Sequence, residues 1–473
     1  MPRYDIIAIG GGTAGLVTAA GAAGLGARVA LIERERLGGE CLWTGCVPSK
    51  ALIAAARTAH AARTAAKVGV DVAGVRPDAK RIFERIRQAQ RAIEPHDSPE
   101  RFRSLGVDVV IGTARFTGEH EIAVDNRRLD ARHLVIATGA RPLVPDIPGL
   151  RETAHYTNET IFTIDRIPRR LLVLGAGVVG LELAQAFARL GSDVRVVEAA
   201  SALLPNEDAE LVDMLTQYVS ADGVQIALNA RVTRARRVDG DVVLDVNVTG
   251  GRREFRGDAL LVAVGRRANV DQLELRVPGI EMRNADLAVD DRLRTNLAHI
   301  WGAGDVIGGL RFTHVADYEA RLVLRNALFP FSAGRDYRVV PWVIFTDPEL
   351  AHVGLTEREA RARHGDDVRI WRRPFDDVDR AIADCQPAGM VKLITDKSGR
   401  LLGAHVLGYA AGHLIAELAL AMKHGLGAKH LSSTIHAYPT YPEAIKQAAD
   451  LWYRSRLTGV TKSVVKWLVS RAE

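Results

Sequence analysis

The feature that most constrains the fold is a unit that occurs twice: an apolar strand, a Gly-x-Gly-x-x-Gly turn, a helix, a second strand and a terminal acid. The glycines and the acid are Gly10, Gly12, Gly15 and Glu33 in the first copy, and Gly175, Gly177, Gly180 and Glu198 in the second. In both copies the acid follows the third glycine at the same spacing. This pattern predicts a strand, a tight turn and a helix packed as one α/β unit, present twice.

Each part of this unit has a role in binding a dinucleotide. The glycines let the backbone approach a pyrophosphate at a helix N-terminus, where the helix dipole favours negative charge. The acid at the end of the second strand accepts hydrogen bonds from ribose hydroxyls. A single glycine turn is also compatible with simple helix–strand packing. Two complete copies instead predict an α/β chain with two Rossmann-like domains and two bound dinucleotides.

A second constraint is the stretch L-G-G-E-C-L-W-T-G-C-V-P-S-K, which begins at Leu37 and holds two of the three cysteines. In a continuous helix, Cys41 and Cys46 would lie about 7.5 Å apart along the axis. We therefore expect a distorted turn, which Gly45 permits, with Pro48 at the first position of the next helix. Cys46 would then lie at a helix N-terminus, where the helix dipole and the ammonium of the lysine four residues later stabilise a thiolate.

This arrangement favours a disulfide that opens and closes during turnover. Two inert buried cysteines are the structural alternative. A zinc half-site is disfavoured, because no second Cys/His cluster with ligand spacing accompanies the pair, and no resident metal is predicted. The third cysteine, Cys385, is assigned a structural role.

Length and composition narrow the class of protein. A chain of 473 residues is long enough for about three domains. Three cysteines in this length are typical of a reducing compartment, and the early first strand leaves no room for a signal peptide, so a cytoplasmic location is expected. The net charge of +6 arises from 63 basic and 57 acidic residues that are mostly interspersed. We interpret this balance as a solvated surface and expect no nucleic-acid partner.

Further signals follow the two glycine turns. The first is a strand that ends in a glycine turn, with the sequence A-T-G-A-R-P at 137–142. The second is Asp305 in I-W-G-A-G-D, just after a buried strand. Asp305 there either binds a polyol chain or caps a helix. From residue 340 onward, the sequence predicts an antiparallel sheet packed against helices. This part of the chain also contains the motif T-I-H-A-Y-P-T-Y-P-E-A at 434–444, which is called the tail motif below. Its expected strands are 339–345, 389–395 and 401–407.

These motifs together resemble the class I pyridine nucleotide–disulfide oxidoreductases, which include dihydrolipoyl dehydrogenase, glutathione reductase and mercuric reductase. The resemblance covers about residues 4–449. It implies two Rossmann-like domains, one for FAD and one for NAD(P), and a C-terminal α+β interface domain in a homodimer with shared active sites. The implied domains are 1–149 and 271–338 for FAD, 150–270 for NAD(P), 339–450 for the interface and 451–473 for a basic helical tail.

The resemblance also assigns roles by position. Cys46 would be the charge-transfer thiol beside the flavin, and Cys41 the interchange thiol that meets the substrate. Lys50 would lie beside flavin N5, with Glu182 as its acidic partner. The residues implied to hold FAD are Gly10, Gly12, Gly15, Glu33, Thr138, Gly139 and Asp305, and those implied to hold the nicotinamide dinucleotide are Gly175, Gly177, Gly180 and Glu198.

The tail motif departs from the thiol–disulfide members of the family. Those members have histidine directly before Pro-Thr, and that position is Tyr438 here, while Glu443 is retained. Histidine shuttles a dithiol's proton at neutral pH, whereas a phenol with a pKa near 10 is a poor base. Mercuric reductases also carry tyrosine at this position, in a tail of the form H-x-Y-x-T-x-x-E. Whether His436, two residues earlier, replaces the missing histidine stays open.

The acceptor implied is a metal ion, as for mercuric reductase, or a disulfide. Two alternatives are a dihydrolipoyl-dehydrogenase-like subunit of a larger complex and a flavin-dependent quinone or metal reductase. The C-terminus K-W-L-V-S-R-A-E lacks the cysteine pair with which mercuric reductases usually end. Glu198 and Gly180 favour NADH over NADPH, because A-A-S-A-L-L-P after the acid offers no cation to a 2′-phosphate.

The C-terminal tail combines cations with large apolar residues. Arg454, Arg456, Lys462, Lys466 and Arg471 alternate there with tryptophan, leucine and valine in one predicted helix from Asp450 to Glu473. Such a helix either packs on its own protein, which we expect, or lies on an anionic membrane surface.

Overall fold

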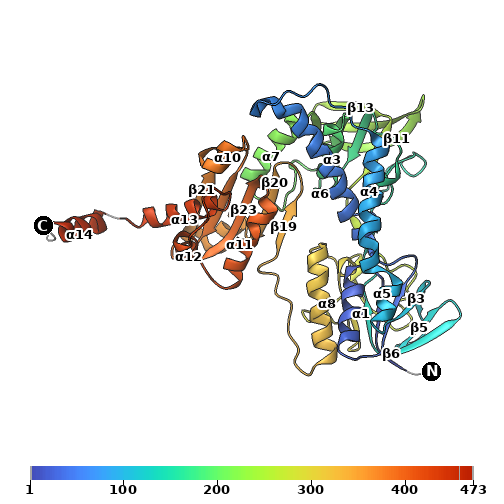
Figure 1. Ribbon diagram of the computed structural model, residues 1–473. Coiled ribbons are helices and arrows are strands. Elements are labelled where there is room, and N and C mark those ends of the chain that lie inside the picture. The colour runs from blue at the N-terminus through green and yellow to red at the C-terminus, as the bar shows by residue number, and fades with distance from the viewer. Residues whose placement is uncertain (1–2, 458, 471–473) are drawn as a thin grey trace. The chain divides into compact units, whose positions relative to one another are not determined.

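The computed structural model describes residues 3–457 and 459–470, which form two compact units (Figure 1). The first unit comprises Met1–Ala56, Arg76–Ala199 and Asn229–Asp336, and the second comprises Arg57–Val75, Ala200–Leu228 and Tyr337–Glu473. The α/β class predicted from the duplicated glycine unit is confirmed. The boundaries between the two dinucleotide-binding domains stay a prediction.

The first unit is built on a sheet that is parallel on one side and antiparallel on the other. Its order is β3-β2-β1-β6-β5-β4, and β18 also pairs with β6. The long strand β6 takes part in both halves, since it runs parallel to β1 and β18 and antiparallel to β5. The strands are β1 (Tyr4–Ile9), β2 (Val29–Glu33), β3 (Asp108–Ile111), β4 (Ala114–Phe116), β5 (Glu121–Val124), β6 (Arg127–Ile136) and β18 (Ile300–Gly302).

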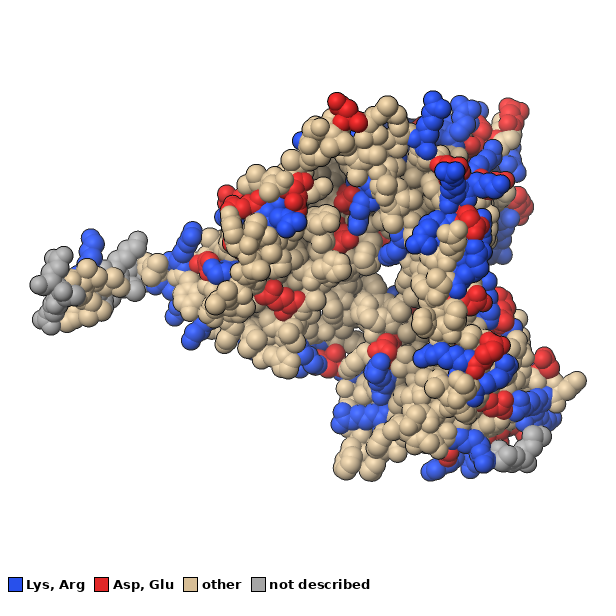
Figure 2. Space-filling model, in the orientation of Figure 1, with Lys and Arg blue, Asp and Glu red and all other residues tan. Residues whose placement is uncertain are grey.

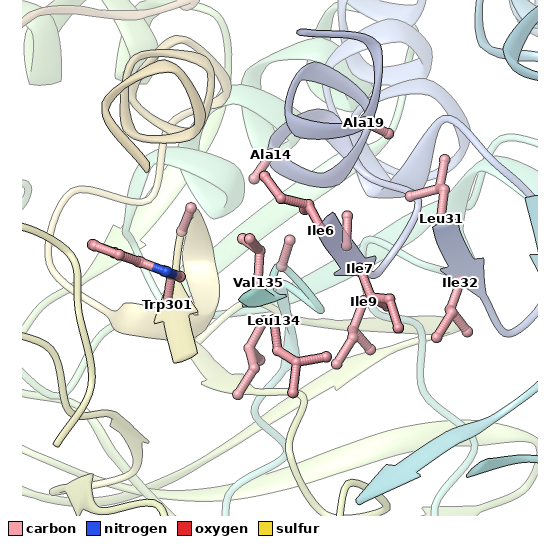
Figure 3. Close-up of a cluster of buried hydrophobic side chains, with 14 of the residues drawn as sticks. Ile6, Ile7, Ile9, Ala14, Ala19, Leu31, Ile32, Leu134, Val135 and Trp301 are labelled. Carbon is pink, nitrogen blue, oxygen red and sulfur yellow. The ribbon is translucent and has the colours of Figure 1, made fainter. Parts of the chain in front are cut away.

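The parallel strands read as unbroken apolar runs because side chains on both of their faces are buried. Ile6, Ile7 and Leu134 point from β1 and β6 into this core, where Leu31 and Trp301 also lie (Figure 3). The helices α1 (Thr13–Gly24) and α8 (Thr313–Leu328) pack side by side in this unit (Figure 1). A parallel sheet presents the ends of its strands and the starts of its helices at one edge, which is where ligands bind in such folds.

The second glycine unit forms as predicted. Strand β8 (Arg170–Leu174) lies between β9 (Asp193–Val197) and β14 (Ala259–Val262), and all three run parallel. Helix α6 (Val178–Arg189) follows the turn after β8. A separate antiparallel sheet contains β11 (Arg231–Val238), β12 (Asp241–Val248) and β13 (Gly251–Gly257).

The remaining elements of the first unit are helices and short strands outside these sheets. They are α2 (Gly39–Trp43), the first part of α3 (Cys46–Thr64), α4 (Ala79–Ile93), η2 (Glu94–Asp97), α5 (Pro99–Ser104), β7 (Ala140–Pro142), η3 (Ile161–Thr163), β15 (Arg266–Ala268), β16 (Met282–Arg283), β17 (Asp286–Leu287) and η4 (Asp305–Ile307). Helix α3 begins at Cys46, so the prediction that Pro48 is its first residue is wrong by two positions. A proline is tolerated anywhere in the first helical turn, because the N–H groups there have no intrahelical acceptor.

The second unit contains a five-stranded antiparallel sheet of order β19-β20-β23-β22-β21. The three predicted strands are present as β19 (Pro341–Ile344), β22 (Met390–Thr395) and β23 (Leu401–Gly408). Two further strands, β20 (Glu349–Gly354) and β21 (Arg369–Pro374), were not predicted. Five of the six residues of β20 are buried and β21 is rich in arginine, so neither shows the apolar–polar alternation typical of a half-buried strand.

Helices cover this second sheet. α11 (Ala411–Lys423) packs on β20 and β23, and α13 (Glu443–Ser455) packs on β21 and β22. The unit's other elements are η1 (Ala65–Val68), α7 (Ala209–Ala221), β10 (Val224–Ala227), α9 (Glu357–His364), η5 (Gly365–Asp367), η6 (Phe375–Asp377), α10 (Asp379–Ala383), α12 (Ala428–Ser433) and α14 (Gly459–Val469).

The tail is not one helix, which corrects the sequence prediction. α13 ends at Ser455 and α14 starts at Gly459, a residue with weak helix propensity. Trp467 and its neighbours on α14 are about half exposed, whereas Arg471 and the side chain of Lys462 lie outside what the structure describes. Among the described helices, none is both long and apolar enough to cross a bilayer. Contact of the tail with a membrane surface stays a prediction.

Charged side chains of both signs lie close together on much of the face shown in Figure 2. On α4, for example, Arg87 and Arg91 both bind Glu84. Many of the basic side chains are therefore paired locally with acidic ones.

Candidate active site

The first glycine turn leads from β1 into α1. Gly10 has a left-handed φ of +112°, and a Cβ there would lie 2.3 Å from the carbonyl oxygen of Ala137. A Cβ on Gly15 would lie 1.8 Å from the carbonyl oxygen of Gly10. Gly12 differs, since its Cβ would meet only Gly39, at an ordinary contact distance of 3.8 Å. Packing of the chain thus requires the first and third glycines, while the second leaves open backbone at the start of α1.

The second glycine turn, between β8 and α6, has the same geometry. A Cβ on Gly175 would lie 2.5 Å from the carbonyl oxygen of Ala263, and one on Gly180 would lie 2.1 Å from that of Gly175. Nothing lies within 4 Å of a Cβ on Gly177. Both turns therefore fit a pyrophosphate, which needs close approach to bare backbone at a helix N-terminus.

The two acids that follow these turns lie in equivalent positions. Glu33 Oε2 accepts a hydrogen bond from the backbone N–H of Gly11 at 2.6 Å. Glu198 Oε2 accepts one from Ala176 at 2.8 Å. Each carboxylate thus lies at the end of its strand, next to its own glycine turn, which is where a ribose of a bound dinucleotide lies.

The redox stretch begins directly beside the first turn. The backbone N–H of Gly38 donates to the carbonyl oxygen of Gly11 at 2.9 Å. A Cβ on Gly39, the first residue of α2, would lie 2.5 Å from Gly12 Cα. Because α2 carries Cys41, this contact places the cysteine pair next to the dinucleotide turn.

Gly45 lies between α2 and α3, and the predicted break in the helix is present at Thr44 and Gly45. The φ of Gly45 is not left-handed, so the turn does not need glycine for its backbone conformation. A Cβ there would lie 3.1 Å from the carbonyl oxygen of Glu40 and 3.4 Å from Glu40 Cγ. Gly45 therefore permits the turn by allowing the backbone before Cys46 to approach α2.

Cys41 and Cys46 are two half-buried thiols that share a hydrogen bond. That hydrogen bond is the largest cause of a low pKa for Cys46, about 6, and the hydroxyl of Thr313 (3.3 Å) and the charge of Lys50 lower it further. The same hydrogen bond, with burial, raises the pKa of Cys41. At neutral pH, Cys46 is therefore the thiolate and Cys41 the thiol.

An ion pair lies one helical turn after Cys46 on α3. Lys50 Nζ binds Glu182 Oε2 of α6 at 2.9 Å, and the side chain of Glu182 is 4% exposed. These residues are 132 positions apart in the sequence, and only the family resemblance paired them. Thr313 was missed, because a threonine in F-T-H-V matches no motif.

Thr138 and Gly139 form the turn at the end of β6. Thr138 Oγ1 donates to the carbonyl oxygen of Asn269 at 2.6 Å, and the N–H of Asn269 donates to the carbonyl oxygen of Gly139 at 3.0 Å. Gly139 has a left-handed φ of +68°. These bonds tie the end of β6 to the segment that returns after β15.

Asp305 is the first residue of η4, directly after β18. The N-cap of η4 is Gly304 and receives no side-chain cap, so the alternative that Asp305 caps a helix is wrong. Burial raises the pKa of Asp305, while Arg266, whose Nε lies 3.4 Å away, opposes this rise. Asp305 is a half-buried acid shortly after the end of a parallel strand, and Gly304 before it lies against Ala14 of α1. This position fits a partner with several hydroxyls, such as the ribityl chain of FAD.

The tail motif lies in the second unit. Tyr438 is 68% exposed, and its hydroxyl donates to Asp379 Oδ2 at 2.8 Å, which raises the pKa of the phenol. His436 Nε2 lies 3.0 Å from Glu417 Oε1, so its carboxylate partner is Glu417 and not Glu443. Glu443 Oε2 is buried and has no hydrogen-bond partner within the described part of the chain.

Comparisons with known proteins agree with this geometry. Residues 4–320 match the model of the pyridine nucleotide-disulphide oxidoreductase family, and residues 340–449 match that of its dimerisation domain, which indicates a homodimer. The chain is 34% identical over 448 residues to a mercuric reductase of Bacillus cereus, covering 94% of this chain and 71% of that protein. It is 32% identical over 468 residues to a dihydrolipoyl dehydrogenase of Bacillus subtilis (strain 168), covering 94% and 97%.

A solved structure is similar over nearly the whole chain. It is the HOCl-induced flavoprotein disulfide reductase RclA from Escherichia coli, with a TM-score of 0.86 and 31% identity, covering 95% of this chain and 100% of that one. A Cu(II) complex of the same protein matches equally well. The glycine turns, the redox cysteines and these likenesses together show that this chain belongs to the pyridine nucleotide–disulphide oxidoreductases, the FAD-dependent enzymes that move electrons from a nicotinamide through a flavin to a disulfide.

Proposed function

We propose that this enzyme takes electrons from NADH and delivers them, through Cys46 and Cys41, to a soft metal ion such as Hg(II) or Cu(II). The observation that carries the proposal is the tail: the position of the family's proton-shuttling histidine is held by Tyr438, whose hydroxyl donates to Asp379. Mercuric reductases among the relatives, and the copper complex of the E. coli reductase, support a metal acceptor for this scaffold.

The chain's own residues define how the dithiol works. FAD held at the first glycine turn would supply the two-electron chemistry that links a nicotinamide hydride to the disulfide. The Cys46 thiolate is then stabilised by hydrogen bonds from Cys41 and Thr313 and by the cation of Lys50. Lys50 itself is held by the buried carboxylate of Glu182, which orients its ammonium group.

When a metal ion oxidises the dithiol, the electrons and protons balance without a general base in the tail motif. The thiolate of Cys46 and the thiol of Cys41 give up two electrons to Hg(II), or to two Cu(II) ions. The sulfur–sulfur bond forms again, and the single proton of Cys41 is released to solvent. A disulfide substrate, in contrast, takes up two protons to give two thiols: one comes from Cys41, and a second must be delivered to the leaving thiolate. Tyr438, whose pKa is raised, is unsuited to deliver this proton at neutral pH.

The proposal is tested by anaerobic reduction of the holoenzyme with NADH, followed by a panel of Hg(II), Cu(II), lipoamide, a small aliphatic disulfide and a quinone. Rapid reoxidation by the metal ions with slow reoxidation by both disulfides is the expected result. Preferential reoxidation by lipoamide would contradict the metal proposal and favour a dihydrolipoyl-dehydrogenase-like function. Preferential reoxidation by the quinone, retained after Cys41→Ser, would favour a flavin-dependent quinone reductase.

We further propose that Tyr438 and Glu443 act on Cys41 of the partner subunit, as the family's homodimer implies. In Tyr438→Phe, reoxidation by the metal ion is expected to slow by about ten- to a hundredfold, because a hydrogen bond from the phenol to a charged thiolate is lost, which is worth roughly 1.5–3 kcal/mol. Flavin reduction by NADH is expected to stay unchanged. Stopped-flow measurement of both half-reactions checks this prediction.

Tyr441→Phe is the matched control for this variant, since the Tyr441 hydroxyl also donates to a carboxylate, Asp384, at 3.1 Å. A slower NADH half-reaction in Tyr438→Phe would place the tyrosine on the nicotinamide side and contradict the proposal.

The nicotinamide preference is a separate proposal. Glu198 is held at the end of β9 by the N–H of Ala176, where a 2′-phosphate would meet its negative charge. This repulsion is expected to cost NADPH about 1–3 kcal/mol, which corresponds to a ten- to hundredfold lower kcat/KM than for NADH. Comparison of kcat/KM for the two cofactors checks it, and Glu198→Gln should narrow the difference. A wild-type preference for NADPH would refute it.

A further inference from the structure

Glu40, the residue before Cys41, is held by side chains from two distant parts of the chain. Both of its carboxylate oxygens accept hydrogen bonds from the guanidinium of Arg266 on β15. Asn158 Nδ2 donates to Glu40 Oε1 at 2.7 Å and to the carbonyl oxygen of Thr44 at 3.2 Å. Because Thr44 lies between the two cysteines, the single amide of Asn158 holds both the side chain and the backbone of the redox segment.

Arg266 connects this segment to the acid of the predicted ribityl site. Its side chain is 18% exposed, and its Nε lies 3.4 Å from Asp305 Oδ2. Its Nη2 also donates to the carbonyl oxygen of Ala140, the first residue of β7, at 2.7 Å. Arg311 holds the backbone of Arg266 in turn, by a hydrogen bond of 3.0 Å to its carbonyl oxygen. The guanidinium is therefore fixed between two carboxylates, Glu40 and Asp305.

We propose that Glu40 is a positioning residue of the redox centre, and that its ion pair with Arg266 sets the balance of charge at the Cys41–Cys46 pair. The inference rests on the proposed role of Cys46 as the thiolate beside the flavin. Glu40 belongs to the stretch that begins at Leu37, but the sequence alone assigned no role to Glu40, Asn158 or Arg266.

The electrostatic reason lies in the proximity of Glu40 to Cys46. The Glu40 stem packs on Gly45, the residue before Cys46, and its negative charge acts to raise the pKa of that thiol, against Cys41, Thr313 and Lys50. The guanidinium of Arg266, which is ion-paired with Glu40, carries the opposite charge. The other charged groups around the two thiols, Glu40 and Arg266 are Lys50 on α3, Asp97 on η2, Glu159 beside Asn158, Asp305 on η4 and Arg311.

The test uses the Cys41→Ser holoenzyme, in which Cys46 is the single titrating thiol of the pair. Its pKa is read from the long-wavelength thiolate–flavin absorbance as a function of pH. Added Glu40→Gln should lower this pKa by about 0.5–1 unit, because an anion is removed and Arg266 stays. Added Arg266→Gln should raise it by a similar amount, since Glu40 then lacks its cation.

Two variants separate charge from structure. Arg266→Lys keeps the cation and should return the pKa close to that of the parent. Asn158→Ala removes the hydrogen bonds to Glu40 and Thr44 without removing a charge. It should therefore leave the pKa of Cys46 within about 0.2 units of the parent value. Glu40→Gln is isosteric and retains an acceptor for Asn158, so it is expected to fold and bind flavin.

The outcomes distinguish this inference from the proposed function. Equal midpoints in Glu40→Gln and Arg266→Gln, or shifts in the same direction, would overturn the inference about Glu40. Absence of the band from Cys41→Ser itself would contradict the assignment of Cys46 to the flavin side. In that case, the pH dependence of Cys46 alkylation by iodoacetamide, read by mass spectrometry in the same variants, still decides whether Glu40 and Arg266 shift the thiol in opposite directions.

Discussion

Replacing Cys46 with serine is expected to lower NADH-dependent reduction of the acceptor by at least about a thousandfold, because a serine hydroxyl cannot form or break a disulfide. In the wild-type enzyme, two-electron reduction should produce a long-wavelength charge-transfer band, since the pKa of Cys46, about 6, makes it a thiolate at neutral pH. Cys46→Ser should show no such band. Cys41→Ser should show it without prior reduction, because Cys46 is then a free thiolate. Anaerobic titration followed by absorbance spectroscopy measures all three.

Cys385→Ser is the matched control for this pair. Cys385 is exposed and lies in the second unit, and its sulfur lies 3.9 Å from the carbonyl oxygen of Lys67, which is a weak contact. Its replacement should leave both the band and the turnover unchanged. A wild-type flavin that bleaches on reduction without a long-wavelength band would refute the assignment of Cys46. A band that persists in Cys46→Ser would assign the flavin-side thiolate to Cys41.

The second large effect concerns the stability of the second unit. Lys392 on β22 is 1% exposed, and its ammonium binds Asp208 at 2.7 Å, Glu210 at 2.8 Å and Glu357 at 2.8 Å. Lys392→Met should lower the free energy of unfolding by about 3–5 kcal/mol, because it leaves buried carboxylate charge without its cation. Most of this destabilisation comes from Asp208, which is 2% exposed and loses its cation. Glu210 and Glu357 keep a cationic partner, because both also bind Arg372. Denaturant titration of the holoenzyme, followed by tryptophan fluorescence, measures it.

The stabilisation should depend on pH in a defined direction. Burial alone would raise the pKa of Asp208, Glu210 and Glu357, but hydrogen bonds from Lys392 lower the pKa of all three. Arg372 lowers the pKa of Glu210 further, and Arg361 lowers that of Glu357. Their contribution is therefore complete above the ordinary carboxyl pKa of about 4 and is lost as the pH falls below it. Burial acts to lower the pKa of Lys392, but the same three carboxylates raise it above its ordinary value. The contribution of Lys392 to the free energy of unfolding is therefore lost only as the pH rises above about 10.4. The difference between wild type and Lys392→Met should be largest between these limits.

Lys397→Met is the control for this prediction. Lys397 binds Asp367, but both side chains are more than half exposed, and exposed ion pairs contribute little to stability. Its unfolding midpoint should match that of the wild type. Equal midpoints for Lys392→Met and Lys397→Met would show that the buried cluster is replaceable by an apolar side chain at no cost.

The sequence alone determined those features that depend on residues close together in the chain. The glycine spacing requires φ angles and close backbone contacts that other residues cannot adopt, so both dinucleotide turns were predicted residue by residue. The position of Cys46 at a helix start was predicted from Gly45 and Pro48 for the same local reason. The pairing of Lys50 with Glu182 came from the family resemblance, since no local pattern connects them.

Only the tertiary structure decided which distant residues complete the redox centre. Thr313 reaches Cys46 from 267 positions away, and Arg266 reaches Glu40 from 226 positions away. The strands β20 and β21 and the ion cluster around Lys392 escaped prediction for a related reason. Buried polar groups take their partners from whichever segment the fold brings alongside, and a hydrophobic or glycine pattern carries no information about that choice. Local geometry therefore placed the cofactor turns and the thiols, whereas long-range packing determined the charges that surround them.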